Sequence, residues 1–168
     1  MDNKKLTLSS LLIALGTLTG HLIYIPVGAA KAFPVQHLIN VLSAVLLGPA
    51  YAVWNAFAIS LLRNMLGVGS LLAFPGSMIG AFLAAYIYKK QRHYFSALLG
   101  EVFGTGILGA LAAYPIAELL MGSSSAVFFF VFPFLISSLG GSIIAYFFLN
   151  AASETEFFEE LEELNSRS

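Results

Sequence analysis

The chain has 168 residues and a net charge of −1, and 58% of its residues are hydrophobic while only 10% are charged. Soluble domains carry about 25% charged residues. This composition, with a mean hydropathy of +0.85, excludes an ordinary soluble protein and predicts an integral membrane protein. The absence of cysteine excludes disulfide bonds and thiolate metal sites.

Six stretches of the chain are candidate membrane spans, since crossing a bilayer takes roughly 20 apolar residues, with a range of about 17–25. In chain order they are Leu6–Ile25, Phe33–Leu47, Ala50–Leu66, Leu71–Tyr88, Tyr94–Met121 and Ala126–Asn150. The second and third are short, which leaves room for a cavity near one face. The fifth is long enough to tilt or to break near Tyr114 and Pro115. We therefore predict that residues 1–150 form one all-α domain of six transmembrane helices.

Lysine and arginine are distributed unevenly between the predicted loops. An even number of spans places both termini on one side, together with the turn between spans two and three and the loop between spans four and five. That side carries Lys4, Lys5, Lys89, Lys90, Arg92 and Arg167. The other side carries only Lys31 and Arg63. Because cytoplasmic loops carry the excess of positive charge, we expect both termini in the cytoplasm and a multi-pass protein of a bacterial cell membrane.

Residues 151–168 form an acidic tail that holds six of the nine acidic residues. Ser153 and Glu156 match a capping box, which would begin a short helix. The apolar face of that helix would consist of Phe157, Phe158, Leu161 and Leu164. The acidity of the tail argues against binding to anionic lipid, and we expect a solvated cytoplasmic tail rather than a docking element.

Polar side chains at membrane depth are costly, which makes them the candidates for function. Gln36, His37 and Asn40 share one face of the second span because they lie three or four residues apart. Arg63 and Asn64 close the third span and reach the same side of the membrane. The other candidates near this depth are His21, Phe33, Phe74, Ser77, Tyr114 and Glu118. A small-molecule pocket is apolar and aromatic with a few convergent polar groups, so this set predicts a substrate site near the outer face.

Each candidate also has a structural explanation. Arg63 could mark the membrane interface, where its side chain can extend to water. Glu118 could pair with Arg63 or His21, and the polar residues of the second span could cap the buried end of a short helix. Nearer the cytoplasm, Glu101 and Asn55 lie at matched depth, and we expect Glu101 to pair with Asn55 or to face a partner subunit.

Function classes other than substrate binding make predictions that the sequence does not meet. The chain contains no catalytic or nucleotide-binding motif, no histidine and carboxylate spacing typical of a metal site, and no cationic patch for nucleic acid. An ion-coupled carrier acting alone predicts internal repeats, of which none is convincing. A small intramembrane enzyme predicts a catalytic pair, for which Glu118 with His21 is the only candidate.

Four segments resemble the substrate-binding S components of energy-coupling factor (ECF) transporters, and within them the ThiW family most closely. These segments are Gly28–His37 with Asn40, Leu46–Pro49, Ser60–Asn64 and Gly69–Gly80. The resemblance covers nearly the whole membrane region. It implies an S-component fold that captures hydroxyethylthiazole, the thiazole precursor of thiamine. Alternatives are another vitamin, a phosphorylated thiazole, or a stand-alone ion-coupled carrier.

The resemblance also implies partners. S components dock on a membrane T component that carries two ATPase subunits, so ATP is used by the partners and this chain needs no cofactor. Many S components meet the T component through an Ala-x-x-x-Ala motif on the first helix. The nearest match here is Ser10 with Ala14, and the small residues Gly16 and Gly20 form a competing stripe.

Overall fold

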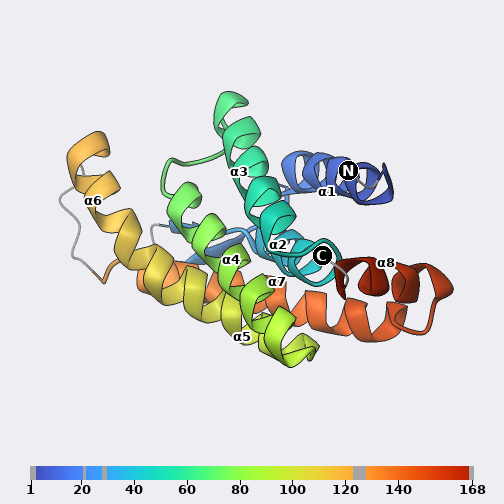
Figure 1. The fold of residues 1–168 in the computed structure, drawn as a ribbon. Helices are drawn as coiled ribbons and strands as arrows, with labels where there is room; N and C mark the ends of the chain where they lie inside the picture. Colours follow the sequence, from blue (N-terminus) through green and yellow to red (C-terminus); the bar gives the residue numbers. More distant parts are fainter. Residues whose placement is uncertain (1–2, 21, 28–29, 123–127, 167–168) are drawn as a thin grey trace.

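The computed structural model describes residues 3–20, 22–27, 30–122 and 128–166. It confirms the all-helical prediction, apart from one small hairpin (Figure 1). The elements are α1 (Asn3–Thr19), β1 (Ile25–Val27), β2 (Ala30–Ala32), α2 (Pro34–Leu46), α3 (Pro49–Met65), α4 (Ala73–Gln91), α5 (Tyr94–Phe103), the π-helical η1 (Gly104–Gly109), α6 (Ala110–Met121), α7 (Val131–Ala152) and α8 (Glu156–Ser166).

Two helical stretches of the described chain are long and apolar enough to cross a membrane, namely Tyr94–Leu120 and Val131–Ala152. The helix α2 is apolar but has only 13 residues. Proline at the first position of α2 and of α3 explains where these helices begin, because proline lacks the N–H that a first turn leaves unpaired. Between them Gly48 has φ of 87°, a conformation that favours glycine and turns the chain sharply.

The first helix is shorter than predicted. It ends at Thr19 instead of Ile25, and the residues that follow form the antiparallel hairpin β1–β2, in which Pro26 pairs with Lys31. Hydropathy predicts a single helical span over Leu6–Ile25 because hydropathy alone does not distinguish a helix from a strand. The β-branched residues at positions 23, 25 and 27, with Pro26 among them, favour extended chain.

The irregularity in the long fifth span also lies elsewhere than predicted. The helix α6 continues through Pro115, whereas the π-helical segment η1 lies earlier, at Gly104–Gly109. This segment is rich in glycine and packs against α4 with the two backbones in contact. A Cβ on Gly104, for example, would lie 2.7 Å from the Gly80 Cα. Close backbone packing, rather than the missing proline N–H, therefore determines where this helix departs from α geometry.

The acidic tail is a docked helix, which corrects the expectation of a solvated tail. Leu161 of α8 is 1% exposed and belongs to the main core. Asn165 Nδ2 donates a 2.6 Å hydrogen bond to the Val45 carbonyl near the end of α2, and Lys4 pairs with Glu160. The predicted capping box is wrong, since the Ser153 hydroxyl donates to the Asn150 carbonyl of α7. Because α2 is short, α8 fills the space below it.

The contacts between elements define two ends of the molecule. At the hairpin end, the β1–β2 hairpin meets the start of α2, the end of α3 and the start of α7. At the tail end, α8 lies beside the start of α1, the end of α2 and the turn between α4 and α5 (Figure 1). Most of the sequence-predicted polar residues belong to the hairpin end.

Candidate functional site

A cavity of about 370 Å³ lies at the hairpin end. It is enclosed by β2, α2, α3, α4, η1 and α7, with the loop before α4. Its lining residues are Lys31, Phe33, Gln36, His37, Arg63, Ser70, Leu72, Ala73, Gly76, Ser77, Thr105, Phe130, Pro133, Phe134 and Ser137. The polar part of this lining comes mainly from α2, α3 and α4 and is called the polar wall, while Phe134 on α7 and Phe130 just before it form the aromatic wall.

The predicted residues Phe33, Gln36, His37, Arg63 and Ser77 all line this cavity. The sequence predicts that these residues lie near one another because of their depth in the membrane and their helical spacing, and in the structure they surround one cavity. Their convergence from three helices and a loop has the form of a small-molecule site.

Gln36 is the centre of the polar wall. Its Oε1 accepts a hydrogen bond from Arg63 Nη1, which links α2 to the end of α3. Its Nε2 donates to Ser60 Oγ at 2.9 Å and to Ser77 Oγ at 2.7 Å. Gln36 is 3% exposed, and its bonds join α2, α3 and α4. The amide therefore fixes three helices around the cavity and orients the guanidinium of Arg63.

Asn40 lies one turn below the cavity and does not line it. Its Nδ2 is 3.1 Å from Ser77 Oγ, 3.2 Å from the Ser77 carbonyl and 2.9 Å from Glu101 Oε1. Asn40 is 1% exposed. We conclude that this residue supports the floor of the site and contacts the polar wall rather than the open space.

Glu101 has different partners in the structure from the one that the sequence predicts. Its Oε1 lies 2.7 Å from His37 Nδ1, 2.9 Å from Asn40 Nδ2 and 3.0 Å from Thr105 Oγ1. The predicted pairing with Asn55 is wrong, because Asn55 binds the hydroxyls of Ser9 and Ser43 between α1 and α2. Depth along a span gives no information about the direction in which a helix faces, and α5 turns Glu101 towards α2.

The contact with Glu101 sets the role of His37. Because Nδ1 faces the carboxylate, Nε2 is the ring nitrogen left for a ligand in the cavity. A histidine ring held by a buried carboxylate has a fixed orientation. Glu101 thus acts as a positioning residue below the site. The signal that could have identified it is its spacing of four from Thr105, which places both on one helical face.

Aromatic rings cover the two cations of the cavity. The Arg63 guanidinium carbon lies 4.7 Å from the centroid of the Phe33 ring, and the Lys31 ammonium lies 4.5 Å from that of Tyr24. The Phe33 backbone N–H donates a 2.8 Å hydrogen bond to Ser137 Oγ, which ties the hairpin to α7. Arg63 is only 3% exposed, so it does not extend to water as an interface marker would.

Phe74, Asn64, Tyr114 and Glu118 are not among the residues that line the cavity. Phe74 packs on Phe57 at 5.8 Å between ring centroids, and Asn64 Nδ2 binds the carbonyls of residues 60 and 70. Tyr114 pairs with Glu118 on α6, and Glu118 is exposed, so the expected pairing of Glu118 with Arg63 is wrong. His21 lies outside the described residues.

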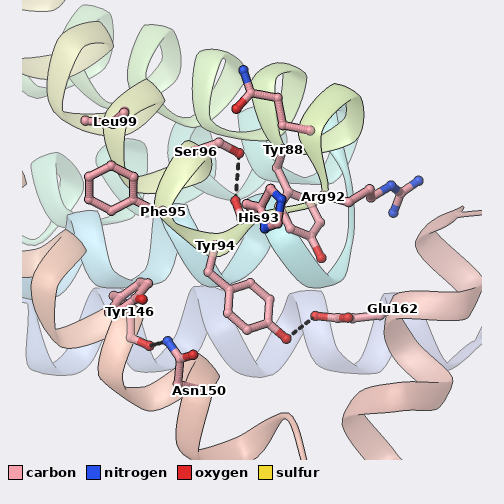
Figure 2. Close-up of a pocket in the computed structure, with 11 residues that line it drawn as sticks. Tyr88, Arg92, His93, Tyr94, Phe95, Ser96, Leu99, Tyr146, Asn150 and Glu162 are labelled. Carbon is pink, nitrogen blue, oxygen red and sulfur yellow. Dashed lines mark hydrogen bonds between the residues drawn. The ribbon is translucent and has the colours of Figure 1, made fainter.

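A second cavity, of about 490 Å³, lies at the tail end (Figure 2). Tyr94 donates a 2.7 Å hydrogen bond to Glu162 across it, and this bond ties α5 to α8. Arg92, at the end of α4, has φ of 55°. None of the predicted site residues lines this cavity, and sequence reasoning missed it because its walls come from three segments that are far apart in the sequence, residues 88–99, 146–150 and 162. No group of three metal-ligating side chains occurs in the described part of the chain.

Comparison with known proteins gives one match. The model of a family described as thiamine-precursor transporter protein (ThiW) matches residues 6–155. No curated protein and no solved structure matches. The family match includes every residue of the cavity at the hairpin end and stops just before α8.

Proposed function

Since the chain belongs to the thiamine-precursor transporter family ThiW, we propose that it is the substrate-capture subunit of an ECF transporter and that it binds hydroxyethylthiazole in the cavity at the hairpin end. The family is one of transporters and not of enzymes. A transporter has a small-molecule substrate and a membrane location, with which the two long apolar stretches agree.

The observation that carries the proposal is the composition of this cavity. Its volume of about 370 Å³ falls within the range of ligand pockets, which is about 300–1,000 Å³. Phe134 on α7 and Phe130 just before it offer faces for a heteroaromatic ring. On the polar wall, His37 and Ser77 offer hydrogen-bonding groups to a ring nitrogen and a hydroxyl.

The charge distribution supports an outward-facing cavity. Lys4, Lys89, Lys90 and Arg92 belong to the tail end, whereas Lys31 and Arg63 belong to the hairpin end. By the positive-inside rule, the tail end with both termini is cytoplasmic. In this proposal the chain crosses the membrane six times, through α1, α2, α3, α4, the continuous α5–η1–α6 helix and α7, of which the last two are long and apolar enough to span it by length and composition. The cavity then opens towards the side from which a precursor arrives.

Energy for uptake comes from partners in this proposal. The first helix offers a docking surface of small residues, since Ser10 and Ala14 are both exposed and the Ser10 hydroxyl is bonded within α1 to the Leu6 carbonyl. The alternative stripe of Gly16 and Gly20 is buried against the rest of the protein. A Cβ on Gly16 would lie 2.6 Å from Ile59 Cδ1 of α3. We therefore propose that Ser10 and Ala14 meet the T component with its ATPase subunits.

Isothermal titration of the purified protein with hydroxyethylthiazole tests the capture role, with thiamine and the pyrimidine precursor as controls. We expect one-site binding of the thiazole alone. His37→Ala and Asn40→Ala each leave buried partners unpaired and should weaken binding by about 1–3 kcal/mol. Asn150→Ala, which removes an exposed amide at the tail end, is the matched control and should bind normally. If none of the three compounds binds the wild-type protein, the proposal fails.

A further inference from the structure

We infer that the cavity at the hairpin end recognises an acidic group on its ligand through Arg63 and Lys31, so that it binds the phosphate ester of hydroxyethylthiazole in preference to the free alcohol. This inference rests on the proposed function. It concerns the chemical class of the ligand and follows from the charges on the cavity wall.

Arg63 is a buried cation whose charge is not neutralised within the described residues. It is 3% exposed and lines the cavity. Its partners are the Gln36 carbonyl oxygen, the Val68 carbonyl at 3.4 Å and the face of Phe33. None of these groups carries a negative charge. Arg63 Nε is also buried and has no hydrogen-bond partner in the described part of the chain.

Lys31 adds a second cation at the same cavity. Its ammonium group lies over the Tyr24 ring, and Tyr24 in turn lies 6.4 Å from Phe33, whose other neighbour is Arg63. The two cations are thus held on neighbouring aromatic rings of the hairpin end. Among the described residues, no carboxylate lies within ion-pair distance of either one.

The carboxylates of the membrane region are committed to other groups. Glu101 is 0% exposed and pairs with His37 on the floor of the site. Gln36, Ser77 and Asn40 separate this carboxylate from the guanidinium. Glu118 is exposed on α6 beside Tyr114. The wall that carries Arg63 and Lys31 therefore has positive charge without a facing acid.

An anionic group on the ligand would neutralise the buried charge of Arg63. Burying a guanidinium without a counter-charge is unfavourable. Arginine forms its strongest hydrogen bonds with carboxylate and phosphate, to which it can present two parallel N–H donors. A neutral alcohol offers one acceptor and no charge. A phosphate ester on the hydroxyethyl arm places an anion against Arg63 while the ring remains against the aromatic wall of α7.

The test compares two ligands on the same protein sample. Isothermal titration is carried out with hydroxyethylthiazole and with its phosphate ester, and inorganic phosphate is titrated as a probe for the anion alone. We expect the ester to bind the wild-type protein at least about tenfold more tightly than the alcohol. In Arg63→Gln the preference should fall to the few-fold that Lys31 supplies, and in Lys31→Gln it should fall by a few-fold.

Expressing each result as the ratio of the two affinities within one variant keeps the test valid if Arg63→Gln folds poorly, because the folded fraction cancels. Lys31 is exposed, and Lys31→Gln provides the second variant. Lys89→Gln and Arg92→Gln at the tail end are the matched charge controls and should retain the wild-type ratio. Equal or tighter binding of the alcohol to the wild-type protein overturns the inference and leaves the capture role intact. Binding of neither thiazole overturns both.

Discussion

Replacing Glu101 by glutamine tests whether a charged carboxylate holds the floor of the site. Glu101 Oε1 accepts hydrogen bonds from His37 and Asn40 and shares the proton of the Thr105 hydroxyl, which lies 3.0 Å from both this oxygen and the Gly76 carbonyl. Glutamine keeps the shape and the Oε1 acceptor but removes the charge. It also places an amide group where Oε2 is now buried with no partner among the described residues.

The magnitude follows from these contacts. A hydrogen bond to a charged group contributes about 1.5–3 kcal/mol, against about 0.5–1.5 kcal/mol for a neutral one, and an unsatisfied buried donor costs about 1–3 kcal/mol. Removing one partner of a buried ion pair costs about 3–5 kcal/mol in other proteins. We therefore expect Glu101→Gln to reduce the free energy of unfolding by about 3–5 kcal/mol and to weaken thiazole binding, because the His37 ring loses its orientation.

Two measurements check this prediction. Thermal unfolding in detergent reports the stability, and isothermal titration reports the affinity for hydroxyethylthiazole. The matched control is Glu118→Gln, which alters the exposed carboxylate of α6 and should change neither. If Glu101→Gln unfolds and binds like the wild-type protein, the charge of the Glu101 side chain does not hold the floor of the site, and the ion pair with His37 is refuted.

The other predictions concern packing and docking. Gly80→Ala should destabilise the protein by about 1–3 kcal/mol in thermal unfolding, because the new Cβ would lie 2.8 Å from Glu101 Oε2. The control is Gly140→Ala, whose Cβ would meet nothing closer than 3.4 Å. Equal stabilities of the two variants would contradict the close packing at Gly80. Leu161→Ala should cost about 2–5 kcal/mol of stability if α8 is part of the core, and no loss would mean that the tail is solvated. Ala14→Trp should abolish uptake by cells and leave ligand affinity unchanged; normal uptake would remove this face of α1 from the docking surface.

The polar face of α2 was predictable because it depends only on local spacing. Residues three and four apart lie on one side of a helix, so Gln36, His37 and Asn40 were grouped correctly from the sequence. Ser77 and Arg63 joined them because each lies at the end of a span that reaches the same side. For these residues the sequence determines both the depth and the face.

The remaining features depend on interactions between distant segments. Glu101 was assigned to the wrong partner because its direction depends on how α5 packs against α2 and α4. The helix α8 was expected to be solvated because the sequence does not show that α2 ends above it, with the Val45 carbonyl available to Asn165. Tyr114 and Glu118 matched the cavity in depth, yet α6 turns them away from it.

Glycine packing and the site chemistry are connected through one threonine. The close approach of η1 to α4 at Gly104 and Gly80 brings the Thr105 hydroxyl within 3.0 Å of the Gly76 carbonyl and, on its other side, of Glu101. Glu101 in turn orients His37, which faces the cavity. A side chain at either glycine would separate the two backbones and move Thr105 away from the carboxylate. The small residues of this helix pair are therefore needed to keep the floor of the cavity in place, as well as to pack the two helices.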